Sequence, residues 1–65
     1  MKEGNPMKKT TFEIIIEQES VIIRRVTGTF TRKPPELQVR QLGKHYAPCR
    51  VIYRSDSWNG TQDFE

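Results

Sequence analysis

His45 and Cys49, the one histidine and the one cysteine of this chain, lie in a short stretch that also contains Ser55 and Asp56. A nucleophile, a histidine base and a carboxylate are the components of a hydrolytic triad. With only 65 residues, however, the chain has little scaffold to hold three such groups within hydrogen-bond distance and to exclude water around them. We therefore expect a protein that is not an enzyme.

Metal and cofactor sites are not expected either. His45 and Cys49 are four residues apart and could face one ion, but a structural zinc site needs four such ligands. The four glycines are scattered singly, so the sequence contains no glycine-rich phosphate loop. Cys49 is the one cysteine, which excludes an internal disulfide, and we interpret it as a partly buried strand residue and His45 as a loop residue.

The distribution of charge is the strongest functional signal. Residues 20–54 hold eight lysines and arginines against Glu36 alone, a local charge of +7 within a net charge of +3. Arginine suits phosphate contacts, and single-strand binders combine such bases with stacking aromatic rings. The sequence thus predicts a nucleic-acid-binding sheet surface, DNA or RNA, formed by Arg24, Arg25, Arg32, Lys33, Arg50, Arg54 and Tyr53. The competing interpretation is a solvated basic face with no such partner.

Alternating apolar residues predict strands in the first half of the chain. Phe12, Ile14 and Ile16 alternate with polar residues, and valine, isoleucine and threonine dominate residues 10–31. These patterns predict a hairpin of residues 10–17 and 21–32. The apolar parity of the second strand is mixed, which indicates a bulge near Arg24 and Arg25 or a bend at Gly28.

The second half is less regular. Pro34 and Pro35 end the hairpin, and residues 37–42 fit a strand by their alternation, although a short helix at 35–42 between the prolines and Gly43 also fits. A further strand is predicted at 49–54. The expected fold is mainly β, a small antiparallel sheet of about four strands, and the alternative is a ββαβ arrangement.

The expected organisation is a flexible leader (1–9), a single small β domain (10–54) and an acidic, mobile tail (55–65). Asn59-Gly60 is a typical tight-turn dipeptide within that tail. No apolar run has the length of a membrane span, and residues 1–6 lack the apolar core of a signal peptide, so we expect a cytoplasmic protein with no membrane partner.

A second functional hypothesis comes from the apolar residues of the hairpin. They occur on both of its faces, which is more than a one-sided sheet can bury, and a second copy or a partner strand would cover the surplus. The sequence therefore also predicts a homo-oligomer or a protein-interaction module, an accessory protein of the small phage or mobile-element type. Its interface would consist of Ile14, Ile15, Ile16, Val21, Ile22 and Ile23.

Overall fold

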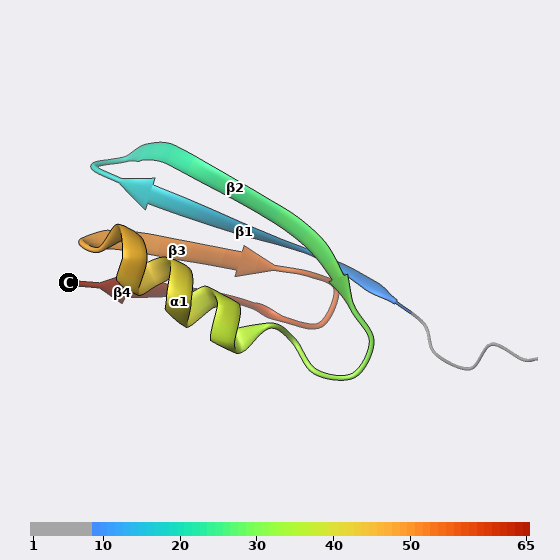
Figure 1. Ribbon diagram of the computed structural model, residues 1–65. Coiled ribbons are helices and arrows are strands. Elements are labelled where there is room, and N and C mark those ends of the chain that lie inside the picture. The colour runs from blue at the N-terminus through green and yellow to red at the C-terminus, as the bar shows by residue number, and fades with distance from the viewer. Residues whose placement is uncertain (1–8) are drawn as a thin grey trace, which may run out of the picture.

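The chain forms one antiparallel sheet with a helix across one of its faces (Figure 1). The computed structural model describes residues 9–65, which contain β1 (Thr10–Gln18), β2 (Val21–Phe30), α1 (Glu36–Tyr46), β3 (Cys49–Arg54) and β4 (Asn59–Phe64). The strand order is β2-β1-β3-β4, so β2 and β4 are the edge strands. The predicted mainly β fold with a four-stranded antiparallel sheet is confirmed.

A two-residue turn joins β1 to β2. Glu19 and Ser20 both have positive φ angles, 52° and 68°, as in the type I′ turns whose twist matches that of hairpin strands. Farther along, Ile16 pairs with Arg24 while Glu17 pairs with Ile22, so Ile23 is an extra residue in β2. This bulge confirms the irregularity expected near Arg24 and Arg25.

The predicted strand at 37–42 is wrong, because these residues belong to α1. The helix starts after the two prolines, where the amide N–H of Val39 donates to the carbonyl of Pro35 at 3.2 Å. It then continues through Gly43, which the sequence had suggested as a stop. Gly43 is buried against Phe64 of β4, and a side chain at this position would collide with the Phe64 ring.

The fourth strand comes from the segment that the sequence assigned to a tail. Residues 59–64 form β4, which pairs with β3 from Cys49 opposite Phe64 to Arg54 opposite Asn59. The sheet therefore extends past residue 54, and Asn59-Gly60 begins a strand instead of forming the tight turn. The predicted leader, residues 1–9, lies outside the described residues except for Lys9.

The core lies between the sheet and α1. Phe12, Ile14 and Ile16 of β1 pack with Val51 of β3 and Val39 of α1, and each of these side chains is at most 6% exposed. At one end of the core, Phe12, Phe30 and Trp58 form an aromatic cluster with centroid distances of 6.2–6.3 Å. The core is thus built mainly on the central strands.

Ile15 points to the other face of the sheet, yet it is only 5% exposed. Its cross-strand neighbours are Arg25 on β2 and Ile52 on β3. Arginine stems can cover apolar surface while their charged ends stay in water. The monomer therefore buries Ile15 without a second layer, so part of the apolar surplus expected on this face is absent.

Candidate interaction surfaces

The sheet face opposite α1, which we call the open face, carries three of the predicted phosphate-binding bases. Arg25, Arg50 and Arg54 are the cross-strand neighbours of Ile15, Glu17 and Glu13 respectively. Side chains directly opposite one another in adjacent strands share a face. The structure therefore gathers Arg25, Arg50 and Arg54 on one exposed surface, but it places carboxylates among them.

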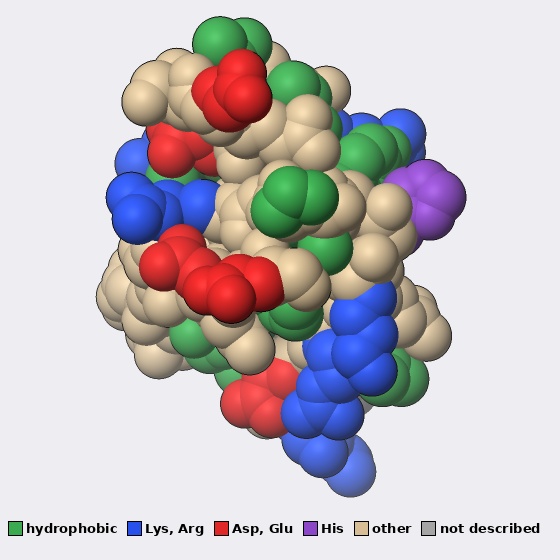
Figure 2. Space-filling view, turned by 90° about the vertical axis from the view of Figure 1, so that its left-hand side faces the viewer, with side chains coloured by type: hydrophobic (Ala, Val, Ile, Leu, Met, Phe, Trp, Pro, Cys, Tyr) green, Lys and Arg blue, Asp and Glu red, His purple; other side chains and the backbone are tan. Residues whose placement is uncertain are grey.

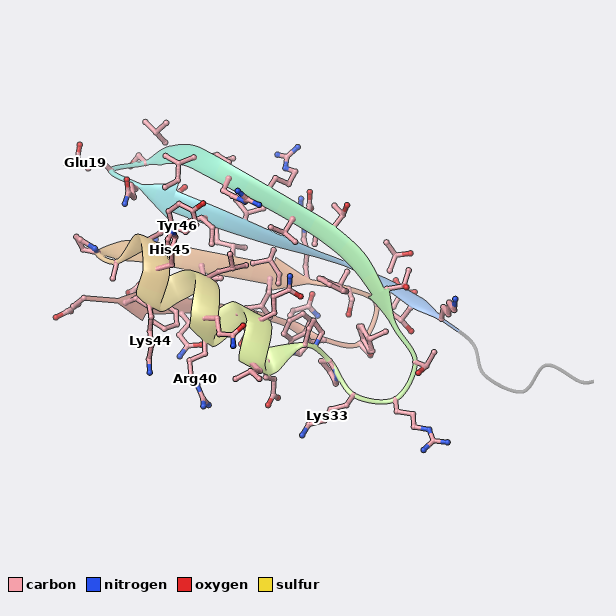
Figure 3. All side chains as sticks on the ribbon, viewed as in Figure 1. Glu19, Lys33, Arg40, Lys44, His45 and Tyr46 are labelled. Carbon is pink, nitrogen blue, oxygen red and sulfur yellow. The ribbon has the colours of Figure 1, made fainter. Side chains whose placement is uncertain are left out.

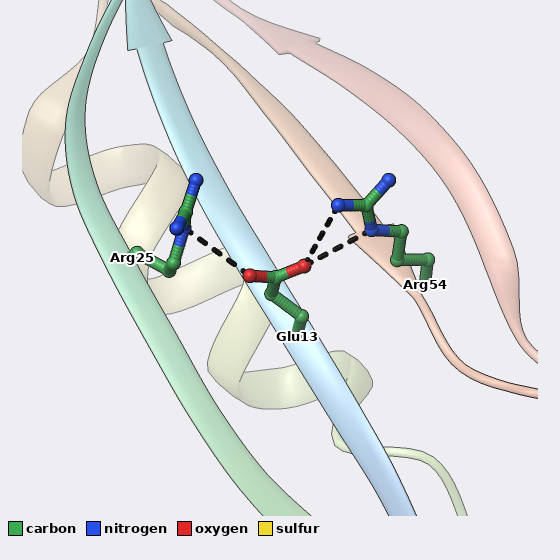
Figure 4. Close-up of polar contacts among 3 residues, drawn as sticks. All are labelled: Glu13, Arg25 and Arg54. Carbon is green, nitrogen blue, oxygen red and sulfur yellow. Dashed lines mark hydrogen bonds and ion pairs between the residues drawn. The ribbon is translucent and has the colours of Figure 1, made fainter.

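Glu13 lies between two of these arginines (Figure 4). Its Oε2 is 3.2 Å from Nε of Arg25, and its Oε1 is 3.0 Å from both Nε and Nη2 of Arg54. One carboxylate of β1 thus joins β2 and β3 across the sheet. An exposed pair of this kind stabilises a fold by about 0–1 kcal/mol, so its main consequence is for the charge of the surface.

The third arginine has its own acidic partner. Nε of Arg50 donates to Oδ1 of Asp63 on β4 at 2.9 Å. This hydrogen bond, with the charges of Asp63 and Glu17 nearby, raises the pKa of the Arg50 guanidinium above its usual value. The open face is therefore a mixed surface of arginines and carboxylates, and a phosphate would have to compete with Glu13 and Asp63 for it.

The other predicted nucleic-acid-binding residues lie outside the open face, either on the helix side of the sheet or in the connection from β2 to α1. Arg24 is on the helix side of β2, where its Nη1 is 3.4 Å from the Tyr46 hydroxyl. Arg32 and Lys33 are exposed in the connection from β2 to α1. Tyr53 is also on the helix side and stacks on Trp58 with a centroid distance of 4.5 Å. The structure thus separates Tyr53 from the arginines that it was expected to accompany.

A basic surface along α1 was predicted only in part, because Lys33 belongs to the predicted site and Arg40 and Lys44 do not. Lys33, Arg40 and Lys44 extend from the same side of the helical segment (Figure 3), and we call them the helix stripe. Within residues 9–65 no carboxylate lies within ion-pair distance of these three residues. In the sequence, Arg40 and Lys44 are four residues apart. This spacing places two side chains on the same face only in a helix, so it indicates a basic surface only once residues 36–46 are known to be helical.

The end-on view in Figure 2 shows how the charges are distributed at this end. Lys and Arg side chains form a column on the side of the molecule that also bears the histidine, and Asp and Glu side chains lie at the centre and left, where further Lys and Arg side chains stand beside them. A groove of about 740 Å³ lies at the end of the sheet where β1 turns into β2. Its charged lining is Glu17, Glu19, Arg50, Asp63 and Glu65. This end of the sheet is therefore mainly acidic.

The predicted interface residues divide into two groups. Ile14 and Ile16 are fully buried and Ile15 nearly so, so these three belong to the fold of the monomer. Val21, Ile22 and Ile23, which we call the β2 patch, are 60%, 51% and 41% exposed. They begin an edge strand whose outer side pairs with no other strand of residues 9–65. α1 packs on β1, β3 and β4, and it meets β2 through the contact of the Tyr46 hydroxyl with Arg24.

Among the described residues, the side chains of Cys49 and Ser55 form hydrogen bonds to backbone groups and not to His45 or Asp56. The Cys49 thiol is buried, donates to the carbonyl of Gly43 at 3.4 Å, and has its pKa raised chiefly by that burial. His45 lies in the last turn of α1, edge-on to the ring of Tyr46, so its interpretation as a loop residue is wrong because the helix continues past Gly43. Over residues 9–65 no three histidine, cysteine or acidic side chains are grouped as metal ligands would be.

The helix of the described segment is too short and too polar to cross a membrane. No family model, no curated protein and no solved structure matches this chain.

Proposed function

We propose that this protein is a small non-catalytic interaction module. Its partner is another polypeptide, which adds one of the partner's own strands to the outer edge of β2. The observation that carries the proposal is the β2 patch, three consecutive exposed aliphatic residues on an edge strand of the sheet. Natural proteins protect such edges with charges, prolines or a covering segment, because an open edge is a template for another strand.

Two further features support strand addition. β2 is a strand of ten residues, and residues 24–30, which follow the bulge at Ile23, can form an uninterrupted ladder of backbone hydrogen bonds with a partner. Because α1 packs on β1, β3 and β4, its backbone does not lie over β2 within residues 9–65, and the helix side of β2 is contacted there by Tyr46 at Arg24 and by Trp58 at Phe30. A partner strand would gain backbone hydrogen bonds from the edge and apolar contacts from the β2 patch.

The test uses as the probe a fluorescent peptide with the sequence of residues 20–31, which is β2 with one more residue at each end. We expect fluorescence anisotropy to detect binding to the wild type and at least tenfold weaker binding to Ile22→Lys, because lysine on an edge opposes strand addition. The matched control is Leu37→Lys on α1, which changes a side chain that is 62% exposed and distant from β2. Equal binding by Ile22→Lys and the wild type would contradict the proposal.

A second candidate function, nucleic-acid binding, has a specific observation in its favour. The helix stripe of Lys33, Arg40 and Lys44 is a row of cations without carboxylate partners among the described residues. This candidate places a phosphate backbone along α1 and not across the arginines of the open face. Titration of a labelled single-stranded oligonucleotide at low salt tests it, and the absence of a complex would exclude it.

A further inference from the structure

We infer that the strand added to β2 is the β2 of a second copy, antiparallel, with a two-fold axis through Val26. This inference rests on the proposed function, since it requires the β2 edge to accept a strand. It deepens that proposal by naming the partner and the register of pairing.

The direction of pairing follows from the charges at the two ends of β2. The turn end carries Glu19 beside the acidic groove, and the opposite end leads into Arg32 and Lys33, all exposed. An antiparallel arrangement places the acidic end of each copy beside the basic end of the other, twice in each dimer. A parallel arrangement would place like charges together at both ends.

The register follows from the hydrogen-bonding alternation and from the arginines of β2. In an antiparallel ladder, two residues that lie opposite each other both direct their backbone N–H and C=O groups toward the partner strand, or both direct them away. When the two strands are identical, the two-fold axis must therefore pass between two copies of the same residue. An axis at Arg24 or Arg25 places identical arginines directly opposite each other, which is unfavourable. Axes at Ile22 or Ile23 lie at the bulge, and axes beyond Val26 place the β2 patch past the end of the other strand at Phe30.

An axis at Val26 avoids both problems. It aligns residues 24 to 28 of one β2 with residues 28 to 24 of the other, and the bulge at Ile23 interrupts the ladder beyond them. Arg25 then faces Thr27 of the second copy, and Arg24 faces Gly28, which has no side chain to obstruct it. The β2 patch of each copy lies beside the last residues of the other strand. The same register brings Glu19 close to Lys33 of the second copy.

The resulting dimer has one continuous antiparallel sheet. Because the two-fold axis is perpendicular to the sheet, both α1 helices lie on the same face, and the open faces with their Glu13 ion pairs form the other. The interface is isologous, so each copy uses the same residues and association stops at two. A closed dimer also removes the exposed β2 edges that would otherwise template further chains.

Disulfide trapping tests the register. In Val26→Cys the two new thiols face each other across the axis, whereas in Ile22→Cys they are eight residues out of register, about 26 Å apart. We expect mild oxidation to cross-link Val26→Cys into a dimer rapidly and Ile22→Cys at least tenfold more slowly. Ile22 is the more exposed position, so random collision would give the opposite order. The wild type, with buried Cys49, is the background control.

Charge exchange provides a second measurement that does not alter the strand. Glu19→Lys alone and Lys33→Glu alone each place like charges at both ends of the dimer, and we expect each to weaken self-association about tenfold. A mixed dimer of the two variants again has one lysine opposite one glutamate at each end, so the mixture should associate like the wild type. Sedimentation velocity measures the self-association of each variant and the association in the mixture.

The outcomes separate the inference from the proposed function. A wild type that stays monomeric across the micromolar range by light scattering, yet binds the peptide of residues 20–31, overturns the dimer and leaves strand addition standing. Faster cross-linking of Ile22→Cys than of Val26→Cys, or a mixture no stronger than its components, overturns this register. A monomer that binds no peptide overturns both.

Discussion

Gly43 of α1 lies against the aromatic ring of Phe64 in β4, so closely that a Cβ at position 43 would collide with the ring. This contact fixes how near the helix sits to the edge of the sheet. It also explains why a residue that weakens helices by roughly 1 kcal/mol relative to alanine occupies the interior of α1.

Replacement of Gly43 by alanine should therefore destabilise the protein despite the better helix propensity of alanine. Overpacking typically costs about 1–3 kcal/mol, which exceeds the propensity gain, so we expect a net loss of about 1 kcal/mol in urea unfolding. In a Phe64→Ala background the obstruction is gone, and the same substitution should then stabilise. A loss of equal size in both backgrounds would show that the contact with Phe64 is not the cause.

Ser20 offers a stabilising substitution. It has a φ of 68°, a left-handed conformation that costs a residue with a side chain about 1 kcal/mol and costs glycine almost nothing. We expect Ser20→Gly to raise the free energy of unfolding by about 0.5–1 kcal/mol. Ser57→Gly is the control, because Ser57 lacks a positive φ. At this position glycine should only raise the entropy of the unfolded chain, which lowers the free energy of unfolding. Thermal unfolding of both variants at equal concentration measures the difference.

The first half of the fold was predictable because its pattern is local. Alternation of Phe12, Ile14 and Ile16 specifies β1, and the mixed parity of the following strand correctly indicated the bulge at Ile23. The helix was mistaken for a strand because Leu37 and Val39 alternate with polar residues, whereas a helix ending before Gly43 had too few residues to show helical spacing. In the structure Val39, Leu42, Gly43 and Tyr46 form the helix face toward the sheet. Only the contact with Phe64, twenty-one residues away, explains the glycine.

The candidate surfaces were only partly predictable, for a related reason. A run of positive charge along the sequence does not reveal which carboxylates will stand opposite it in a sheet. Glu13 and Asp63 lie outside the basic segment of residues 20–54, yet they pair with Arg25, Arg54 and Arg50. Exposure of Val21, Ile22 and Ile23 likewise depends on β2 being an edge strand, which is a property of strand order.

Cys49 predicts a pH dependence of stability. Burial, assisted by the negative charge of Asp63, raises the pKa of its thiol above the ordinary value of 9.0. The folded state therefore holds this proton at a pH where the unfolded state releases it. The contribution to stability is complete below about pH 9 and is lost as the pH rises through the higher pKa of the folded protein.

Comparison of the wild type with Cys49→Ala measures this contribution. The difference in unfolding free energy between the two proteins should be constant from pH 6 to 8 and should shrink above about pH 9. The same burial should make the native thiol react with a disulfide reagent at least tenfold more slowly than in urea. A thiol that reacts equally fast in both conditions would show that Cys49 is accessible in the native protein.

The last prediction distinguishes the two basic surfaces as sites for nucleic acid. Arg40→Gln with Lys44→Gln removes two charges from the helix stripe, and Arg50→Gln with Arg54→Gln removes two from the open face. The total charge changes equally, so a difference between the double variants reports on location. Because Arg50 and Arg54 already pair with carboxylates, we expect the helix variant to lose more affinity for a labelled single strand.

The salt dependence of binding shows how many phosphates each surface contacts. If Lys33, Arg40 and Lys44 each neutralise one phosphate, the logarithm of the binding constant should fall against the logarithm of salt with a slope of about −2. The helix double variant should reduce the slope to roughly −0.7, and the open-face variant should leave it unchanged. Circular dichroism confirms that both variants fold. A larger change for the open-face variant would return the site to the sheet, since phosphates would then displace Glu13 and Asp63 from their arginines.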